Sequence, residues 1–159
     1  LRFFTVYGPW GRPDMAPMIF TKAILKGEPI YVNNFGKMRR DFTYIDDIVE
    51  GVYRCCLKPA TSNNEFDRTK PEPSTSYAPH RVFNIGNNKS IELKYFIELL
   101  ESKIGKKASM KLVPLPEGDV ISTKADTSAL ESWIGFKPST SIEEGVEKFL
   151  SWYFEFYGF

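Results

Sequence analysis

Histidine and cysteine are scarce in this sequence. His80 is the only histidine, and it lies in a proline-flanked stretch far from any cysteine or serine motif. Zinc sites and nucleophilic triads need several convergent groups, so we expect neither kind of site and no bound metal. The two cysteines, Cys55 and Cys56, are neighbours, a spacing that suits neither a disulfide framework nor a metal site. This usage favours a reducing compartment.

An excess of one charge and a long apolar run are also missing. The chain has 21 Lys plus Arg against 20 Asp plus Glu, a net charge of +1. Such a balance argues against a nucleic-acid surface, so we expect no nucleic-acid partner. No apolar stretch approaches the roughly 18 residues of a membrane span, and no signal-peptide pattern opens the sequence. We therefore expect a cytoplasmic protein.

Enough apolar residues are present to build a packed core, since 42% of the 159 residues are hydrophobic and 15% are aromatic. Apolar periodicity, capping residues and turn residues predict an alternation of strands and helices, typical of an α/β fold. The expected strands are 1–6, 30–32, 40–44, 81–86 and 108–115. The expected helices are 15–25, 45–57, 90–104 with Ser90 as its cap, a short helix between Asp126 and Gly135, and one that follows a Ser141–Glu144 capping box.

The helix predicted at 45–57 has the clearest pattern. Its apolar residues recur at helical spacing and predict one buried face, made of Ile45, Ile48, Val49, Val52, Tyr53 and Cys56. Asp46 and Asp47 suit the amino end of a helix, which favours a structural role over paired acid and base catalysis. The polar, proline-rich stretch at 59–79 predicts an exposed excursion.

Two arginines stand where a ligand could reach them. Arg12 follows the turn at Gly8 and Pro9, and loops that leave a strand in α/β proteins commonly face a ligand crevice. Arg40 enters a strand, where a guanidinium can bind a phosphate through two hydrogen bonds. Spacing alone leaves the alternative of a surface ion pair of Arg39 or Arg40 with a nearby aspartate, namely Asp41, Asp46 or Asp47.

Four stretches carry a resemblance to a known family: RFFTVYGPWGRPDM, KGEPIYVNNFGKMRRDFTYIDDIVEGV, FNIGNNKSIEL, and EGDVISTKADTSALESWIGFKPSTSIEEGVEKFLSWY. Together they resemble the carboxyl-terminal part of an extended short-chain dehydrogenase/reductase of the NAD-dependent epimerase/dehydratase family, and are most similar to UDP-glucuronate 4-epimerases. The resemblance implies a small mixed α/β substrate-binding lobe that follows the last strand of a Rossmann domain. Residues 1–14 would end that domain and cross over, and residues 15–159 would form the nucleotide-sugar lobe, with a variable loop at 59–79.

The family's catalytic and cofactor motifs are missing from this sequence. The resemblance implies oxidation of the sugar at C4 by NAD, with the tyrosine of a Tyr-x-x-x-Lys pair as base, a 4-keto intermediate, and reduction on the other face. None of the eight tyrosines has a lysine four residues later, and no G-x-x-G-x-x-G follows a strand. We therefore expect no catalytic residue here, NAD held mainly by a separate Rossmann domain, an inactive isolated chain, and a homodimer for the whole protein.

The resemblance also assigns binding residues. Phe3 and Val6 would approach the nicotinamide, and Thr5 and Arg12 the sugar carboxylate. The uracil would be contacted by the backbone of Ile30, Tyr31, Val32 and Asn33. Arg40 would bind the diphosphate, and Asp119 would contact the ribose hydroxyls. Pro116 departs from the pattern, because relatives often carry arginine or glutamine there. Another UDP-hexose epimerase, a nucleotide-sugar dehydratase and a non-catalytic nucleotide-sugar-binding module remain as alternatives.

Overall fold

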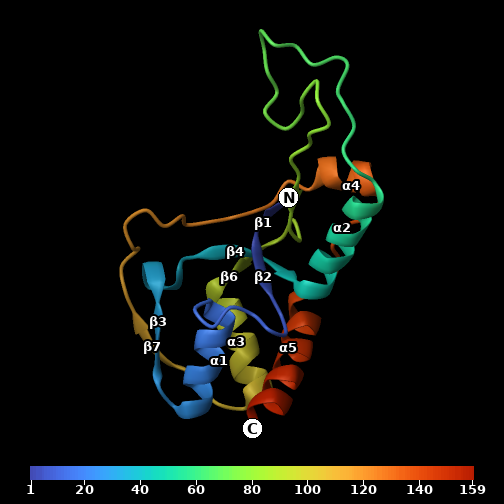
Figure 1. Cartoon of the computed structure of the whole chain (residues 1–159). Helices are drawn as coiled ribbons and strands as arrows, with labels where there is room; N and C mark the ends of the chain where they lie inside the picture. Colours follow the sequence, from blue (N-terminus) through green and yellow to red (C-terminus); the bar gives the residue numbers. More distant parts are fainter.

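The computed structural model describes residues 1–159, and its elements form the mixed α/β architecture that the sequence predicts (Figure 1). The helices are α1 (Ala16–Lys26), α2 (Ile45–Leu57), α3 (Leu93–Ile104), α4 (Ser128–Ile134) and α5 (Ile142–Tyr157). The strands are β1 (Arg2–Phe3), β2 (Thr5–Tyr7), β3 (Pro29–Val32), β4 (Arg39–Tyr44), β5 (Asn84–Ile85), β6 (Ser90–Glu92) and β7 (Ser109–Leu112).

The strands form three small sheets. In the largest, β4 lies between β2, which runs parallel to it, and β6, which runs antiparallel. β1 pairs with β5, and β3 with β7, both in parallel. The strand expected at residues 1–6 is thus split at Phe4, where the chain passes from its pairing with β5 to its pairing with β4.

The core lies between β4 and the helices α1, α3 and α5. Phe42 of β4 stacks on Phe96 of α3, with ring centroids 4.6 Å apart. Phe96 and Phe149 of α5 are fully buried, and Tyr7 of β2 meets Phe42 edge to face at 5.9 Å. Because Phe42 packs β4 into this core, the backbone that carries Arg40, two residues earlier on the same strand, is held rigidly.

Local signals set several helix ends as predicted. Gly27 ends α1 with a φ of 71°, in the left-handed region that glycine adopts without strain. At α4 the cap expected at Asp126 is one residue off: the N-cap is Thr127, which makes no side-chain cap bond, and Asp126 accepts from the Ser128 amide from just outside the helix. The Ser141 hydroxyl caps α5 by accepting from the Glu144 amide at 3.1 Å, as its half of a capping box requires.

The cap predicted at Ser90 is wrong. Ser90 and Ile91 belong to β6, where they pair with Asp41 and Arg40 of β4. α3 begins only at Leu93 and has no side-chain cap. The ladder with β4 satisfies the backbone of this segment, so tertiary pairing overrides a local preference for capping.

The buried face predicted for α2 is only partly correct. Ile48 is buried, but Val49 and Tyr53 are 57% and 59% exposed, and Cys56 is exposed as well. Asp47, in contrast, is buried. Its carboxylate accepts hydrogen bonds from the amides of residues 139 and 140 and so ties α2 to the segment that leads into α5.

The predicted excursion after α2 projects away from the rest of the chain (Figure 1). Its two ends meet at Trp133 of α4. The Trp133 indole donates to the Lys58 carbonyl at 3.1 Å, and the cationic groups of Lys58 and Arg81 lie 4.7 and 5.1 Å from its ring. Further out, Phe66 packs near Tyr77, with ring centroids 6.2 Å apart.

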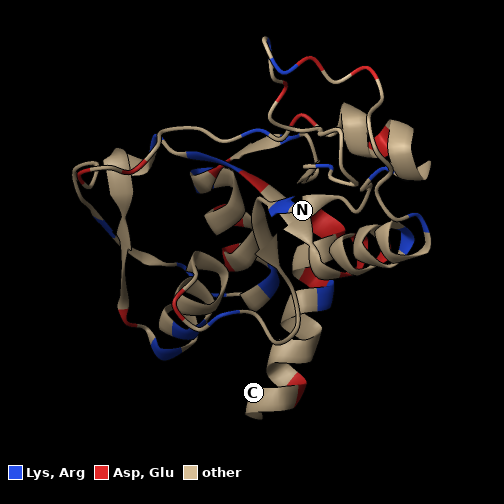
Figure 2. Cartoon of the chain, turned by 45° about the horizontal axis from the view of Figure 1, so that its top comes forward, with Lys and Arg blue, Asp and Glu red and all other residues tan.

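Charges of both signs are interspersed along the chain in the view of Figure 2. Basic and acidic residues face one another in pairs such as Lys103 with Glu147 and Lys148 with Glu144. None of the helices is both long and apolar enough to cross a membrane.

Candidate functional site

A cleft of about 200 Å³ opens between β2, the start of α1, β3 and β4. Most of its lining is apolar, with a few polar side chains, which is the usual character of a small-molecule site. Five of the residues predicted from the resemblance lie in its wall: Thr5, Tyr31, Asn33, Arg40 and Asp119. The fold therefore brings together side chains that are up to 114 residues apart in the sequence.

The pleat of β3 divides its predicted residues into two groups. Tyr31 is 60% exposed and lines the cleft, whereas Ile30 and Val32 are buried in the core on the opposite face of the strand. Beyond the strand, Asn34 and Phe35 adopt positive φ angles of 48° and 52°. The side chains of Ile30 and Val32 are therefore unavailable to a ligand in the cleft, and the Val32 carbonyl already accepts from the Val113 amide at 3.1 Å.

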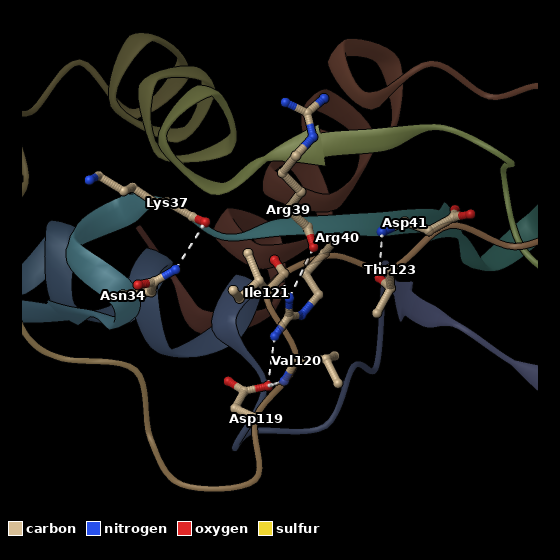
Figure 3. Close-up of polar contacts among 9 residues, drawn as sticks. All are labelled: Asn34, Lys37, Arg39, Arg40, Asp41, Asp119, Val120, Ile121 and Thr123. Carbon is tan, nitrogen blue, oxygen red and sulfur yellow. Dashed lines mark hydrogen bonds and ion pairs between the residues drawn. The ribbon is translucent and has the colours of Figure 1, made fainter.

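Arg40 and Asp119 form the charged end of the cleft (Figure 3). The Arg40 guanidinium donates to Asp119 Oδ1 at 2.8 Å, and to the carbonyl oxygens of Arg39 and Ile121 at 2.9 and 3.2 Å. Arg39 points the opposite way and donates to Glu92 at 2.6 Å. Both arginines are thus in ion pairs, but with partners other than the aspartates that spacing suggested.

This arrangement leaves binding capacity unused. Arg40 has five N–H donors, and the contacts above occupy Nη1 and one hydrogen of Nη2, which leaves Nε–H and the second Nη2 hydrogen. Asp119 uses Oδ1 for Arg40 and for the Val120 amide, so Oδ2 has no hydrogen-bond partner in the structure. The pair can therefore donate to an anion and accept from a hydroxyl at adjoining points.

Asp41 holds the segment that carries Asp119 against β4. Its carboxylate is completely buried and accepts from the amides of Asn87 and Ala125, each at 2.8 Å. The Asp41 amide in turn donates to the Thr123 hydroxyl at 3.1 Å (Figure 3). A side chain on Gly86 would meet this carboxylate and Ala125, so glycine is needed there. Sequence reasoning missed this role, because the partners of Asp41 lie 46 and 84 residues away.

A second hollow, of about 480 Å³, adjoins the cleft at Met15, which lines both. Phe3 and Val6, predicted to approach the nicotinamide, lie in its wall together with Arg12. Phe3 is 53% exposed, so the apolar wall is open to a ligand or to another part of the protein. Thr5 faces the cleft and Arg12 the second hollow, and no hydrogen bond joins them.

Arg12 lies on an exposed loop and is paired with Asp14. Its Nη2 donates to Asp14 Oδ2 at 2.5 Å, and its Nε donates to Oδ1 at 3.1 Å. The hydrogen bond raises the pKa of the guanidinium and lowers the pKa of the carboxyl, and both side chains are mostly exposed. Such a pair is worth little in water, so an incoming anion can compete for Arg12.

Comparisons with known proteins identify the family of this chain. The NAD dependent epimerase/dehydratase family matches residues 1–86. Protein CapI of Staphylococcus aureus is 53% identical over 157 residues, which are 99% of this chain and 47% of that protein. A probable UDP-glucuronate 4-epimerase of Rhizobium meliloti is 47% identical over 96% of this chain and 45% of its own length. The chain thus spans about half the length of these relatives.

Solved structures give the same result for the fold. The UDP-glucuronic acid 4-epimerase of Bacillus cereus, in complex with UDP-glucuronic acid and NAD, superposes with a TM-score of 0.79 and 29% identity. The match covers 98% of this chain and 45% of that one. Since the family match extends over more than half of the 159 residues, this chain belongs to the NAD-dependent epimerase/dehydratase family.

Proposed function

We propose that this chain is the substrate-binding lobe of an NAD-dependent UDP-sugar 4-epimerase that interconverts UDP-glucuronate and UDP-galacturonate. The observation that carries the proposal is the cleft in which Arg40 and Asp119 meet Thr5, Tyr31 and Asn33. The names of the relatives and the ligands of the Bacillus cereus structure support the choice of UDP-glucuronate. In this proposal residues 1–14 end a Rossmann domain, and residues 15–159 form the lobe.

The charged end of the cleft suits the diphosphate and ribose of a nucleotide sugar. The unused Nε–H and Nη2–H of Arg40 would donate to the diphosphate, while the free oxygen of Asp119 would accept from a ribose hydroxyl. The Arg40–Asp119 contact keeps the guanidinium in place before the ligand arrives, which reduces the entropy lost on binding. The backbone from Ile30 to Asn33 would contact the uracil.

The second hollow fits a nicotinamide ring, because Phe3 and Val6 give it an apolar wall and no acidic side chain lines it. When bound, NAD would take a hydride from the sugar C4 and return it to the opposite face. The rest of the cofactor would be held outside this chain, and so would the base. Catalysis therefore belongs to the whole protein, and the isolated 159-residue chain should not convert the sugar.

Thr5 and Arg12 would approach the carboxylate of a uronate from the two hollows that they line, which adjoin at Met15. A hydroxyl and a guanidinium together suit that anion. Their purpose goes beyond affinity, because a 4-keto uronate is a β-keto acid and can lose carbon dioxide when its carboxylate adopts the right geometry. Firm orientation of the carboxylate would suppress that loss.

The test compares two adjacent arginines in the intact protein. Arg40→Ala should weaken binding of UDP, measured by calorimetry, about 10- to 100-fold, since hydrogen bonds to charged groups are lost. Arg39→Ala is the matched control, because its side chain points away from the cleft and should leave UDP binding unchanged. Equal effects of the two substitutions, or no conversion of UDP-glucuronate by the wild-type protein, would contradict the proposal.

A further inference from the structure

The loop that carries Arg12 has a backbone conformation that tryptophan rarely adopts. Residues 8–11 form a tight turn in which the Gly11 amide donates to the Gly8 carbonyl at 3.2 Å. Trp10, the third residue of this turn, has a φ of 60°. Glycine normally occupies such a position, because a bulky residue with positive φ is strained. The turn therefore needs a compensating contact.

Trp10 finds that contact on the carboxyl-terminal half of α5. Its ring meets Phe156 edge to face at 4.7 Å and lies 5.6 Å from Trp152. Trp152 and Phe156 stack on each other at 5.4 Å, and Trp152 also lies 6.2 Å from the buried Phe149. A continuous row of aromatic rings thus joins the tip of the loop to the core.

All the aromatic rings that contact Trp10 belong to α5. The side chain remains 74% exposed, and the aromatic rings near it, Trp152 and Phe156, both come from α5. Close packing fixes α5 itself, since a side chain on Gly145 would overlap the Tyr7 ring at the base of the same loop. The loop is therefore attached to one helix at two points, Tyr7 and Trp10.

Arg12 follows Trp10 by two residues and lines the second hollow with it. Its hydrogen bonds go to Asp14 of the same loop, so they do not fix the loop relative to the cleft. We infer that the aromatic pair Trp152 and Phe156 positions Arg12 through Trp10, and thereby determines how well the site selects an anionic sugar over a neutral one. This inference deepens the proposed function and rests on it.

The first experiment measures binding of UDP-glucuronate and UDP-glucose to the intact protein by calorimetry. Phe156→Ala should weaken binding of UDP-glucuronate about three- to tenfold, the usual range for loss of an aromatic pair, and leave UDP-glucose unchanged. In an Arg12→Ala background, Phe156→Ala should have no further effect, because the two residues act through one path. Phe159→Ala is the control, since its ring contacts Tyr153 and not Trp10.

The second experiment needs no ligand. Hydrogen exchange at the amides of Gly11 and Met15, which close the loop's two turns, should become faster in Phe156→Ala than in Phe159→Ala. Unchanged exchange, equal weakening of both nucleotide sugars, or additive effects in the double variant would overturn the inference. If the wild-type protein binds neither nucleotide sugar, the proposed function fails, and exchange still reports separately whether α5 anchors the loop.

Discussion

Replacing Asp41 by alanine should destabilise the protein strongly, although the residue is outside the cleft. The substitution leaves two buried amides, those of Asn87 and Ala125, without an acceptor. An unsatisfied buried donor costs about 1–3 kcal/mol, so the two together should cost about 4 kcal/mol. For a domain of this size that loss corresponds to a fall of about 10 °C in Tm. Asp41→Asn keeps one acceptor oxygen and should lose about half as much.

Thermal unfolding of the intact protein, followed by circular dichroism, measures this loss. Asp46→Ala is the matched control, because Asp46 is on the next element and makes no side-chain hydrogen bond in the structure, so its Tm should stay within about 2 °C of wild type. Hydrogen exchange at the amides of Asn87 and Ala125 gives the local readout. If the Tm of Asp41→Ala equals that of the Asp46→Ala control, and hydrogen exchange at these amides is as slow as in wild type, the reasoning about the buried carboxylate is refuted.

Three further predictions concern packing and pH. Tyr7→Phe should stabilise the protein by about 1 kcal/mol in denaturant titrations, because the buried hydroxyl has no hydrogen-bond partner. Burial also raises the pKa of Tyr7, so wild type should lose stability as pH rises above about 10, and the variant should lose less. Gly145→Ala should lower Tm by several degrees, because the new methyl group would overlap the Tyr7 ring, and a wild-type Tm would exclude that close approach. The hydrogen bond from Lys107 lowers the pKa of Glu101, so this pair stabilises the fold above about pH 4.5 and stops doing so as pH falls and the carboxylate is protonated. In Glu101→Gln the free energy of unfolding should therefore fall less than in wild type between neutral and acid pH.

The sequence predicted most elements because their signals are local. Gly27 ends α1 and the Ser141 hydroxyl caps α5, and each acts within a few residues of its own position. Ser90 shows the limit of that reasoning, since it carries a local capping preference but pairs with β4, which comes from a distant part of the chain. The periodicity of α2 correctly predicted a helix, but it could not show which of the apolar residues are packed against other parts of this chain. Val49 and Tyr53 are exposed although they belong to the predicted buried face.

The candidate site was harder to predict because its contacts are distant in sequence. Arg40 and Asp119 are 79 residues apart, and spacing alone pointed to nearer aspartates as partners. The family resemblance supplied both residues as ligand contacts, but gave no indication that they bind each other. The strain at Trp10 is likewise invisible in the sequence, because it depends on the backbone geometry of the turn, and the α5 ring that contacts Trp10 comes from the other end of the chain.

Because both ends of the excursion are attached to Trp133, a change in the length of this segment should have little effect on the stability of the rest of the chain. Lys58 and Arg81 meet at one ring, so the distance that the intervening chain must close is already set. Doubling the length of a flexible closed segment costs only about 0.6 kcal/mol in chain entropy. Residues between these two points can therefore be added or removed in evolution, or replaced by a tag or a small inserted domain, while the cleft, none of whose lining residues lies between Lys58 and Arg81, keeps its shape.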